Sequence, residues 1–412
     1  MKLTKYKLKE ILDVTRGASL SGEFYATEGQ YVRLTCGNFD YQNNCFKENK
    51  SKDNLYYVGD FKSDFLMDEG DIITPLTEQA IGLLGSTAII PESGKYIQSQ
   101  DVAKIICKEE LLDKDFAFYL ISSTLVKQQL SAAAQQTKIR HTSPDKIKDC
   151  TVWIPELTEQ KRIGKLLRSL DRKIELNRAI NQNLEVMAKQ LYDYWFVQFD
   201  FPNEEGKPYK SSGGEMVWNE KLKREIPKGW NVAKLTDEIE LQYGFPFSTE
   251  LFTEQVTSVP VVRIRDILDN SVSAYTTEEV DERYLLQKQD LLIGMDGNFH
   301  MNYWTDNISY LNQRSVRLRA KNSSNVSIVQ AKYDIQPYIK AKEERAKGST
   351  VGHLSDKDMK DLYVLVCPNK KLREKFDSIL SMIVKNRNEI TFLTKQRDEL
   401  LPLLINGQIT IE

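Results

Sequence analysis

A polar stretch of the chain, residues 135–142, combines amide, hydroxyl and cationic side chains without any periodic spacing of apolar residues. In a duplex groove, amide side chains can pair with adenine and cationic ones with guanine, while hydroxyl and Lys groups hold phosphates. We therefore expect this stretch to contact DNA, through Gln136, Thr137, Lys138 and Arg140.

A second set of polar residues lies at matching places in the two halves of the chain. It comprises Gln98, Gln100, Asn312, Gln313 and Arg314. Any one of these residues is explained equally well as a loop residue that faces water. Their recurrence in both halves favours contact with DNA. On the same grounds of equivalent position, we expect DNA contacts from Arg33, Arg263, Ser349, Thr350 and His353.

Motifs of common enzyme classes are missing from the sequence. It contains no phosphate-binding G-x-x-x-x-G-K-[ST] loop, no G-x-G-x-x-G, no G-x-S-x-G and no H-E-x-x-H. The D/N-P-P-Y/F motif of amino-methyltransferases is missing as well. The five cysteines form no Cys-x-x-Cys pair and the three histidines do not cluster. We expect no catalytic residue, no metal site and no cofactor bound by this chain.

Composition indicates a globular protein of more than one domain. The chain has 412 residues, of which 28% are charged and 41% hydrophobic, and its net charge is −2. A nucleic-acid-binding protein is usually more basic, so cations must be concentrated locally. No apolar run approaches the roughly 20 residues of a membrane span, and the start does not resemble a signal peptide. We expect a cytoplasmic protein with reduced thiols.

Two long helices must position these loops. Apolar residues follow an a/d spacing after Pro155, and the same spacing returns after Pro368, each member 209 positions later. The predicted seam includes Ile163, Leu170, Asn177, Asn181, Asn386 and Leu393. We expect the helices to pair antiparallel within the chain, so that Ile163 meets Leu404, Trp195 meets Leu372 and Asn181 meets Asn386.

The region before each helix also repeats. Leu8–Ser21 corresponds to Leu235–Ser248, Val32-Arg33-Leu34 to Val262-Arg263-Ile264, Gln100 to Gln313 and His141 to His353. The predicted fold is α+β: two similar mixed α/β domains separated by two long helices that form an intramolecular antiparallel coiled coil, with a pseudo-twofold internal repeat. The predicted segments are a first domain at 1–155, a long helix at 156–200, a linker at 201–228, a second domain at 229–367, a second long helix at 368–405 and a tail at 406–412.

Four stretches of the sequence resemble the specificity subunits of Type I restriction–modification systems. They are Val152–Ile163, Glu225–Trp230, Tyr243–Ser248 and Glu399–Ile409, in the family's order. The resemblance implies a non-catalytic subunit whose two target-recognition domains each read half of a bipartite site in double-stranded DNA. It also implies helices that set the spacing and dock two methyltransferase subunits, with restriction/translocase subunits as further partners. S-adenosylmethionine, ATP and Mg would then serve those partners, and no membrane is involved.

Two other classes of function remain open at this point. A non-catalytic adaptor with two protein- or RNA-binding modules on a coiled-coil strut fits the helices equally well. An enzyme with an unrecognised site has the least support, because no catalytic motif was found.

Overall fold

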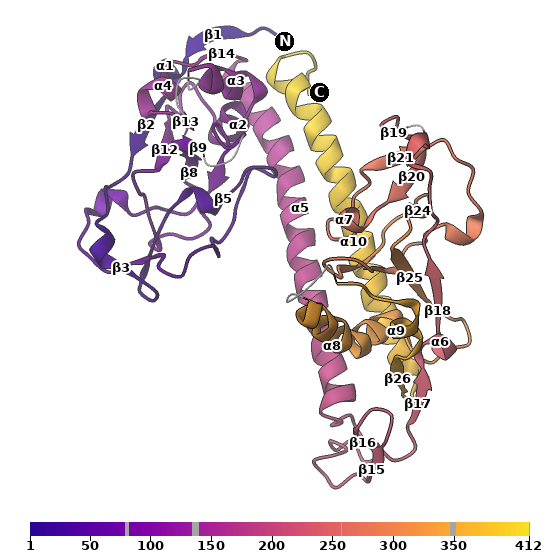
Figure 1. Ribbon diagram of the computed structural model, residues 1–412. Helices are drawn as coiled ribbons and strands as arrows, with labels where there is room; N and C mark the ends of the chain where they lie inside the picture. Colours follow the sequence, from indigo (N-terminus) through magenta and orange to yellow (C-terminus); the bar gives the residue numbers. More distant parts are fainter. Residues whose placement is uncertain (79–81, 134–139, 257, 347–351, 412) are drawn as a thin grey trace. The chain divides into compact units, whose positions relative to one another are not determined.

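The computed structural model describes residues 1–78, 82–133, 140–256, 258–346 and 352–411; the side chains of Arg140 and Ala346 are not described. The chain divides into two compact units. The first unit comprises Met1–Lys173 together with Leu393–Glu412, and the second unit comprises Ile174–Phe392. Figure 1 labels many of the helices and strands of both units.

The first unit is built on an antiparallel four-stranded sheet in the order β10-β8-β12-β2. Its strands are β2 (Leu12–Arg16), β8 (Ile72–Pro75), β10 (Ala88–Ile89) and β12 (Val102–Cys107). A second sheet, in the order β11-β4-β7-β3, contains β3 (Tyr25–Ala26), β4 (Tyr31–Arg33), β7 (Tyr56–Tyr57) and β11 (Tyr96–Ile97). The remaining pairs are β1 (Thr4–Lys7) with β14 (Thr151–Ile154), β5 (Phe39–Asp40) with β6 (Cys45–Phe46), and β9 (Thr77–Glu78) with β13 (Arg140–His141).

The second unit repeats this arrangement, which confirms the predicted internal repeat. Its main sheet has the order β23-β22-β25-β18, from β18 (Ile239–Tyr243), β22 (Leu291–Gly294), β23 (Met301–Tyr303) and β25 (Ser315–Ala320). Its second sheet has the order β24-β20-β21-β19, from β19 (Phe252–Thr253), β20 (Val259–Val262), β21 (Ala274–Thr276) and β24 (Tyr310–Leu311). The strand pair β17 (Asn231–Lys234) with β26 (Tyr363–Val366) corresponds to β1 with β14. Among the described residues, the hairpin β15 (Met216–Asn219) and β16 (Arg224–Pro227) is specific to this unit.

Strand register corrects one correspondence expected from the sequence. Arg33 pairs with Ile97, which bridges Leu66, whereas Val261 pairs with Tyr310, which bridges Leu285. The structural counterpart of Arg33 is therefore Val261, and Arg263 corresponds to Thr35, the N-terminal cap of the next turn. The match of Val32-Arg33-Leu34 to Val262-Arg263-Ile264 was therefore wrong, because the structural correspondence is shifted by two residues from the sequence match.

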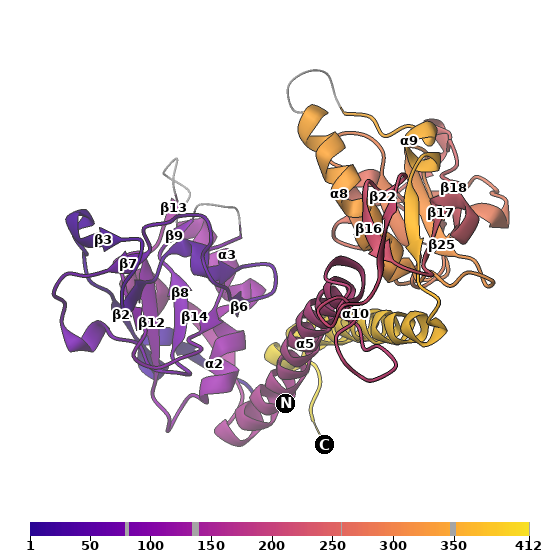
Figure 2. The ribbon, with the colours of Figure 1, turned by 90° about the horizontal axis from the view of Figure 1, so that it is seen from below.

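Short helices complete each unit. In the first they are α1 (Leu8–Ile11), α2 (Lys114–Ile121), α3 (Thr124–Ala133) and α4 (Pro144–Lys148). In the second they are α6 (Leu235–Glu238), α7 (Ile264–Ile267), α8 (Ile328–Ala346) and α9 (Asp356–Lys360). Helix α8 packs against β25 and β26 (Figure 2).

The two long helices are α5 (Leu157–Tyr192), followed by a π-helical turn at Asp193–Val197, and α10 (Lys370–Ile405). In the second unit they pack antiparallel, as expected. Asn386 donates through Nδ2 to Oδ1 of Asn181 at 2.9 Å, and Asn181 donates to the carbonyl of Ile383 at 3.1 Å. The predicted Asn181–Asn386 pair is thus confirmed.

The predicted seam agrees with burial along both helices. Ile163, Asn177, Asn181 and Leu393 are buried, whereas Leu170 and Asn386 are half-buried. In the first unit, Ile163 and Leu404 belong to one hydrophobic core. In the second unit, Leu372 belongs to the core against which Trp195 packs.

The first unit contains a buried ion pair that the sequence did not predict. The guanidinium Nη1 of Arg397 donates to Oδ1 of Asp171 at 2.8 Å, and both side chains are about nine-tenths buried. The hydroxyl of Tyr119 donates to the other oxygen of Asp171. Burial raises the pKa of the Tyr119 hydroxyl, so the phenol stays protonated and acts as a donor to the carboxylate. An ion pair closed off from water tolerates the loss of neither partner.

We predict that Arg397→Met lowers the free energy of unfolding by roughly 3 kcal/mol, because Asp171 stays buried without its cation. The double variant Asp171→Asn/Arg397→Met should recover part of this loss, since Asn keeps an acceptor for Tyr119 and carries no charge. Urea unfolding of the full chain measures both. Lys395→Ala is the matched control, because Lys395 meets Glu399 at 3.9 Å with both side chains exposed, and its effect should stay within about 0.5 kcal/mol. Equal losses in the single and double variants would contradict the assignment.

Candidate nucleic-acid interface

A tight turn between β24 and β25 presents Asn312, Gln313 and Arg314 on the second unit. The backbone N–H of Phe245 donates to the carbonyl of Leu311 at 2.8 Å, and the N–H of Gln313 donates back to the carbonyl of Phe245 at 2.8 Å. Gly244 makes this approach possible, because a Cβ on it would lie 1.9 Å from the carbonyl oxygen of Asn312. The turn is therefore held by main-chain contacts, and its side chains are free to face outward.

Arg314 sits in the left-handed backbone region, with a φ of 64°, which L residues with large side chains adopt rarely. Its side chain is 67% exposed, yet its Nη1 donates to Oδ2 of Asp296 at 2.6 Å. This hydrogen bond raises the pKa of Arg314, which is cationic in any case. The guanidinium is thus held through one of its N–H donors, while the side chain as a whole is exposed.

Asp296 also binds His353, whose Nδ1 lies 2.6 Å from Oδ1 of the carboxylate. Burial raises the pKa of Asp296, but the hydrogen bonds from Arg314 and His353 outweigh it, and the pKa lies below its ordinary value. Asp296 is therefore a carboxylate near neutral pH. It joins two exposed donors from distant parts of the sequence.

Arg314 borders an open hollow of about 500 Å³ on the surface of the second unit, which we call the Arg314 hollow. It is lined by Arg263, Ile264, Arg265, Asn298, His300, Asn312, Gln313 and Arg314. Four predicted contact residues, Arg263, Asn312, Gln313 and Arg314, are thus brought together. Three arginines with amide and imidazole groups provide donors for phosphates and base edges.

The two other arginines of the Arg314 hollow are held differently. Arg263 is half-buried, and its Nη2 donates to the carbonyl and hydroxyl oxygens of Ser273 at 2.8 and 2.6 Å. Arg265 is 68% exposed, and its contacts are looser, with Nε 3.4 Å from the Ser273 hydroxyl and 3.9 Å from Asp266. The Arg263 side chain is therefore bonded within the domain to Ser273, whereas the Arg265 side chain is exposed to solvent.

His353 also lines a second hollow of about 500 Å³, the Lys342 hollow, together with Tyr338, Ala341, Lys342, Arg345 and Asp358. Lys342 pairs with Asp358 at 2.5 Å, and the Tyr338 hydroxyl donates to the same carboxylate at 3.0 Å. Burial raises the pKa of Asp358, but hydrogen bonds from Lys342 and Ser355 outweigh it and hold the pKa well below its ordinary value. His353 thus links two cation-bearing hollows on one unit.

Two predicted residues of the first unit are buried and occupied internally. The Gln98 amide donates to the carbonyls of Thr15 and Val102 at 2.9 and 3.1 Å. The Arg33 guanidinium lies 3.9 Å from the ring centre of Tyr25 and donates to the carbonyl of Asn54. Contact with DNA would require these bonds to break, so the geometry favours a structural role for both side chains.

The other predicted residues of the first unit lie at its surface or outside the described residues. Gln100 is exposed on the turn that corresponds to the one carrying Gln313. Arg140 belongs to β13 through its backbone. Gln136, Thr137 and Lys138, and likewise Ser349 and Thr350 of the second unit, lie outside the described residues, and their contacts with DNA stay predictions.

Sequence reasoning missed Arg265, Asn298, His300, Lys342 and Arg345 at these hollows. A weak signal existed in two places. Arg263 and Arg265 are two residues apart, and Lys342 and Arg345 share one face of a helix that leads to the predicted Ser349 and Thr350. Nothing in the sequence pattern indicates that Asp296 joins Arg314 to His353, because 18 and 57 residues separate them.

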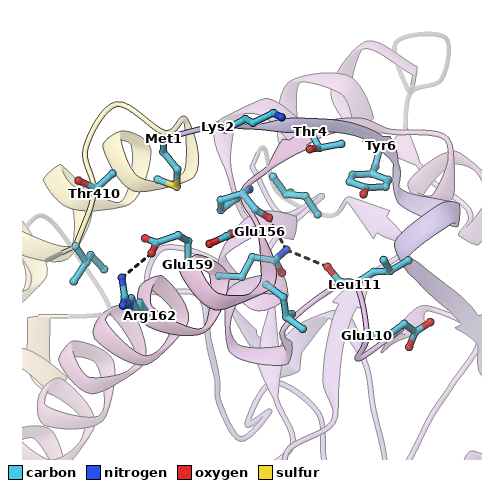
Figure 3. A pocket seen from close by; sticks show the side chains of 15 residues that line it. Met1, Lys2, Thr4, Tyr6, Glu110, Leu111, Glu156, Glu159, Arg162 and Thr410 are labelled. Carbon is cyan, nitrogen blue, oxygen red and sulfur yellow. Dashed lines mark hydrogen bonds and ion pairs between the residues drawn. The ribbon is translucent and has the colours of Figure 1, made fainter.

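A larger hollow of about 790 Å³ in the first unit has a different character (Figure 3). Three glutamates, Glu110, Glu156 and Glu159, line it beside Lys2 and Arg162, and Arg162 is paired with Glu159 at 2.8 Å. Because the carboxylates offset the cations, this hollow has no excess of positive charge to attract phosphate. This hollow therefore does not belong to the candidate DNA interface.

The described residues contain neither a membrane-spanning helix nor a cluster of metal-ligating side chains. None of their helices combines the length and apolar character needed to cross a membrane. They also bring together no group of three or more His, Cys, Asp or Glu that could hold a metal ion.

Comparisons with known proteins agree with one another. A family model of the Type I restriction modification DNA specificity domain matches residues 2–186 and 227–398. The specificity subunit of the Type I restriction enzyme MjaIX from Methanocaldococcus jannaschii is 24% identical over 329 residues, which cover 76% of this chain and 73% of the relative. That of EcoBI from Escherichia coli is 26% identical over 201 residues, covering 45% and 41%. The crystal structure of a Type-I restriction-modification S subunit from M. genitalium shares the fold, with a TM-score of 0.62 at 18% identity over 98% of this chain and 96% of that one.

We predict that Gly244→Ala and Gly17→Ala each destabilise the protein by about 1–3 kcal/mol, because the turns behind them must move. A Cβ on Gly17 would lie 2.2 Å from the carbonyl oxygen of Gln98, at the equivalent turn of the first unit. Thermal unfolding measures the effect. Gly22→Ala is the matched control, since the nearest atom to its Cβ would be 3.9 Å away. Equal stability of all three variants would show that the turns are not held as described.

Proposed function

The chain belongs to the Type I restriction–modification DNA specificity family and acts in sequence-specific DNA recognition, and from this premise we propose that each unit reads one half of a bipartite duplex site. The single observation that supports the proposal is that both units have the same strand order but carry different residues on their surfaces. Both units place a turn between matching strands, β11 and β12 in the first unit and β24 and β25 in the second, where the chain passes from the second sheet to the main sheet. In the second unit this turn carries Arg314, whereas the first unit has Asp101 at that place. One scaffold with two different reading surfaces suits two different half-sites.

Charge distribution supports duplex DNA as the ligand. The net charge of the chain is −2, so cations must be gathered where phosphates bind. The Arg314 hollow brings Arg265 to the amides of Asn312 and Gln313, and the Lys342 hollow adds the exposed Arg345. Cations and amides on the same unit provide groups for holding phosphates and reading bases. These groups favour a nucleic acid over the protein ligand of a coiled-coil adaptor, and the family match favours DNA over RNA.

We further propose that the long helices dock two methyltransferase subunits. In the second unit, one face of α5 leaves Leu176, Ile180 and Met187 59%, 38% and 45% exposed. Apolar residues at such helical spacing are typical of a surface that another helix covers. The chain itself would supply no catalysis, and methylation with S-adenosylmethionine would reside in these partners. ATP- and Mg-dependent restriction and translocation would reside in further subunits of the same cytoplasmic complex.

A domain exchange tests the reading of half-sites. Replacing residues 1–155 with the matching domain of a relative should change one half-site and leave the other, because the divergent loops lie within each unit. Selection from random duplex pools, with the full chain bound to its methyltransferase partner, gives both half-sites. The reciprocal exchange of residues 229–367 is the control and should change only the other half. An exchange that altered both half-sites together would contradict independent reading.

A further inference from the structure

We propose that Arg314 reads a guanine in the half-site of the second unit, and that Asp296 is the residue that positions it. This inference rests on the proposed function and deepens it, since it assigns one base to one side chain.

Charge argues against a phosphate as the ligand of Arg314. The Asp296 carboxylate lies 2.6 Å from the guanidinium and is only 17% exposed. It cancels the charge that would attract a phosphate and would itself repel one. A base edge is uncharged, so its hydrogen bonds with the guanidinium lose little from the nearby carboxylate. The pair is therefore suited to a base.

The geometry of the Arg314 guanidinium also favours a base edge as its ligand. A guanidinium has five N–H donors in one plane, and among the described residues Asp296 is the acceptor of one of them. The donors that remain can approach the O6 and N7 acceptors of guanine in the major groove together, which is the commonest specific contact of Arg. An arginine that is already anchored loses less rotamer freedom on binding than a free one.

The backbone beneath Arg314 is also fixed. The N–H of Met295 donates to the carbonyl of Arg314 at 2.9 Å, and the N–H of Gly244 donates to the carbonyl of Ser315 at 3.0 Å. Asp296 follows Met295 directly in the sequence. The Met295–Asp296 segment thus holds both the backbone and the guanidinium of Arg314, which limits the directions that the side chain can take.

Arg265 provides an internal contrast. It borders the same hollow with the same exposure but has only loose contacts at 3.4 and 3.9 Å. An exposed cation with only loose contacts suits a phosphate, which accepts hydrogen bonds from many directions. We therefore expect Arg265 to contribute affinity without base preference, and Arg314 to contribute base preference at one position.

The test uses the full chain with its methyltransferase partner and selection from random duplex pools. The wild type should select a guanine at one position of the second half-site, preferred about 5- to 150-fold over other bases. Arg314→Ala, which removes the N–H donors of the guanidinium, should abolish this preference and leave all other positions unchanged. Asp296→Asn should weaken it at the same position only. Replacing that guanine with 7-deazaguanine should reduce the affinity of the wild type and not that of Arg314→Ala.

Arg265→Ala is the matched control. Its selected sequence should be unchanged, and its log–log salt slope should fall by about 1. The inference is overturned if Arg314→Ala and Asp296→Asn, both folded by thermal unfolding, select the wild-type sequence at every position. A wild type that selects no bipartite duplex would instead refute the proposed function, so the two failures are distinguishable.

Discussion

The antiparallel packing of α5 against α10 is the constraint on which the rest of the structure depends. Both helices contribute residues to both units, so the same seam enters the core of each. Its register is specified by polar groups. The Asp171–Arg397 ion pair serves the first unit and the Asn181–Asn386 hydrogen bond the second. A seam of apolar residues alone would tolerate sliding by a heptad, whereas these partners would then be buried without each other.

The helices also anchor the sheets that carry the candidate interface. Strand β14 ends at Ile154, three residues before α5 begins, and β26 ends at Val366, four residues before α10 begins. From this fixed base each unit builds the same two sheets and the same turn, packed against a glycine. The side chains on the turn can change without disturbing its backbone contacts. A constant frame with variable side chains is the physical basis for one fold reading different sequences.

The sequence predicted the parts of the structure that follow a period or a repeat. The 209-residue offset led to the antiparallel pairing and the Asn181–Asn386 contact, because a/d spacing specifies which helix face is buried. Contacts between residues far apart without such a period were not predictable. The bonds of Asp296 with Arg314 and His353 depend on how strands β22 and β25 meet. Gln98 shows a different limit of the sequence prediction. It was expected to contact DNA because it is polar and lies beside a loop, but its side chain is buried and bonded to neighbouring strands.

Lengthening both helices together is the most direct test of whether the helix pair sets the gap between the two half-sites. Four residues would be inserted near Asn177 and four near Asn386, and the methylated sites mapped in cells that carry the chain with its methyltransferase partner. Four helical residues add about 6 Å and turn roughly 40° beyond a full turn, and a base pair adds about 3.4 Å. We predict unchanged half-sites with a spacer longer by about one or two base pairs. The same half-sites at the original spacing would show that the helix pair does not set the gap between them.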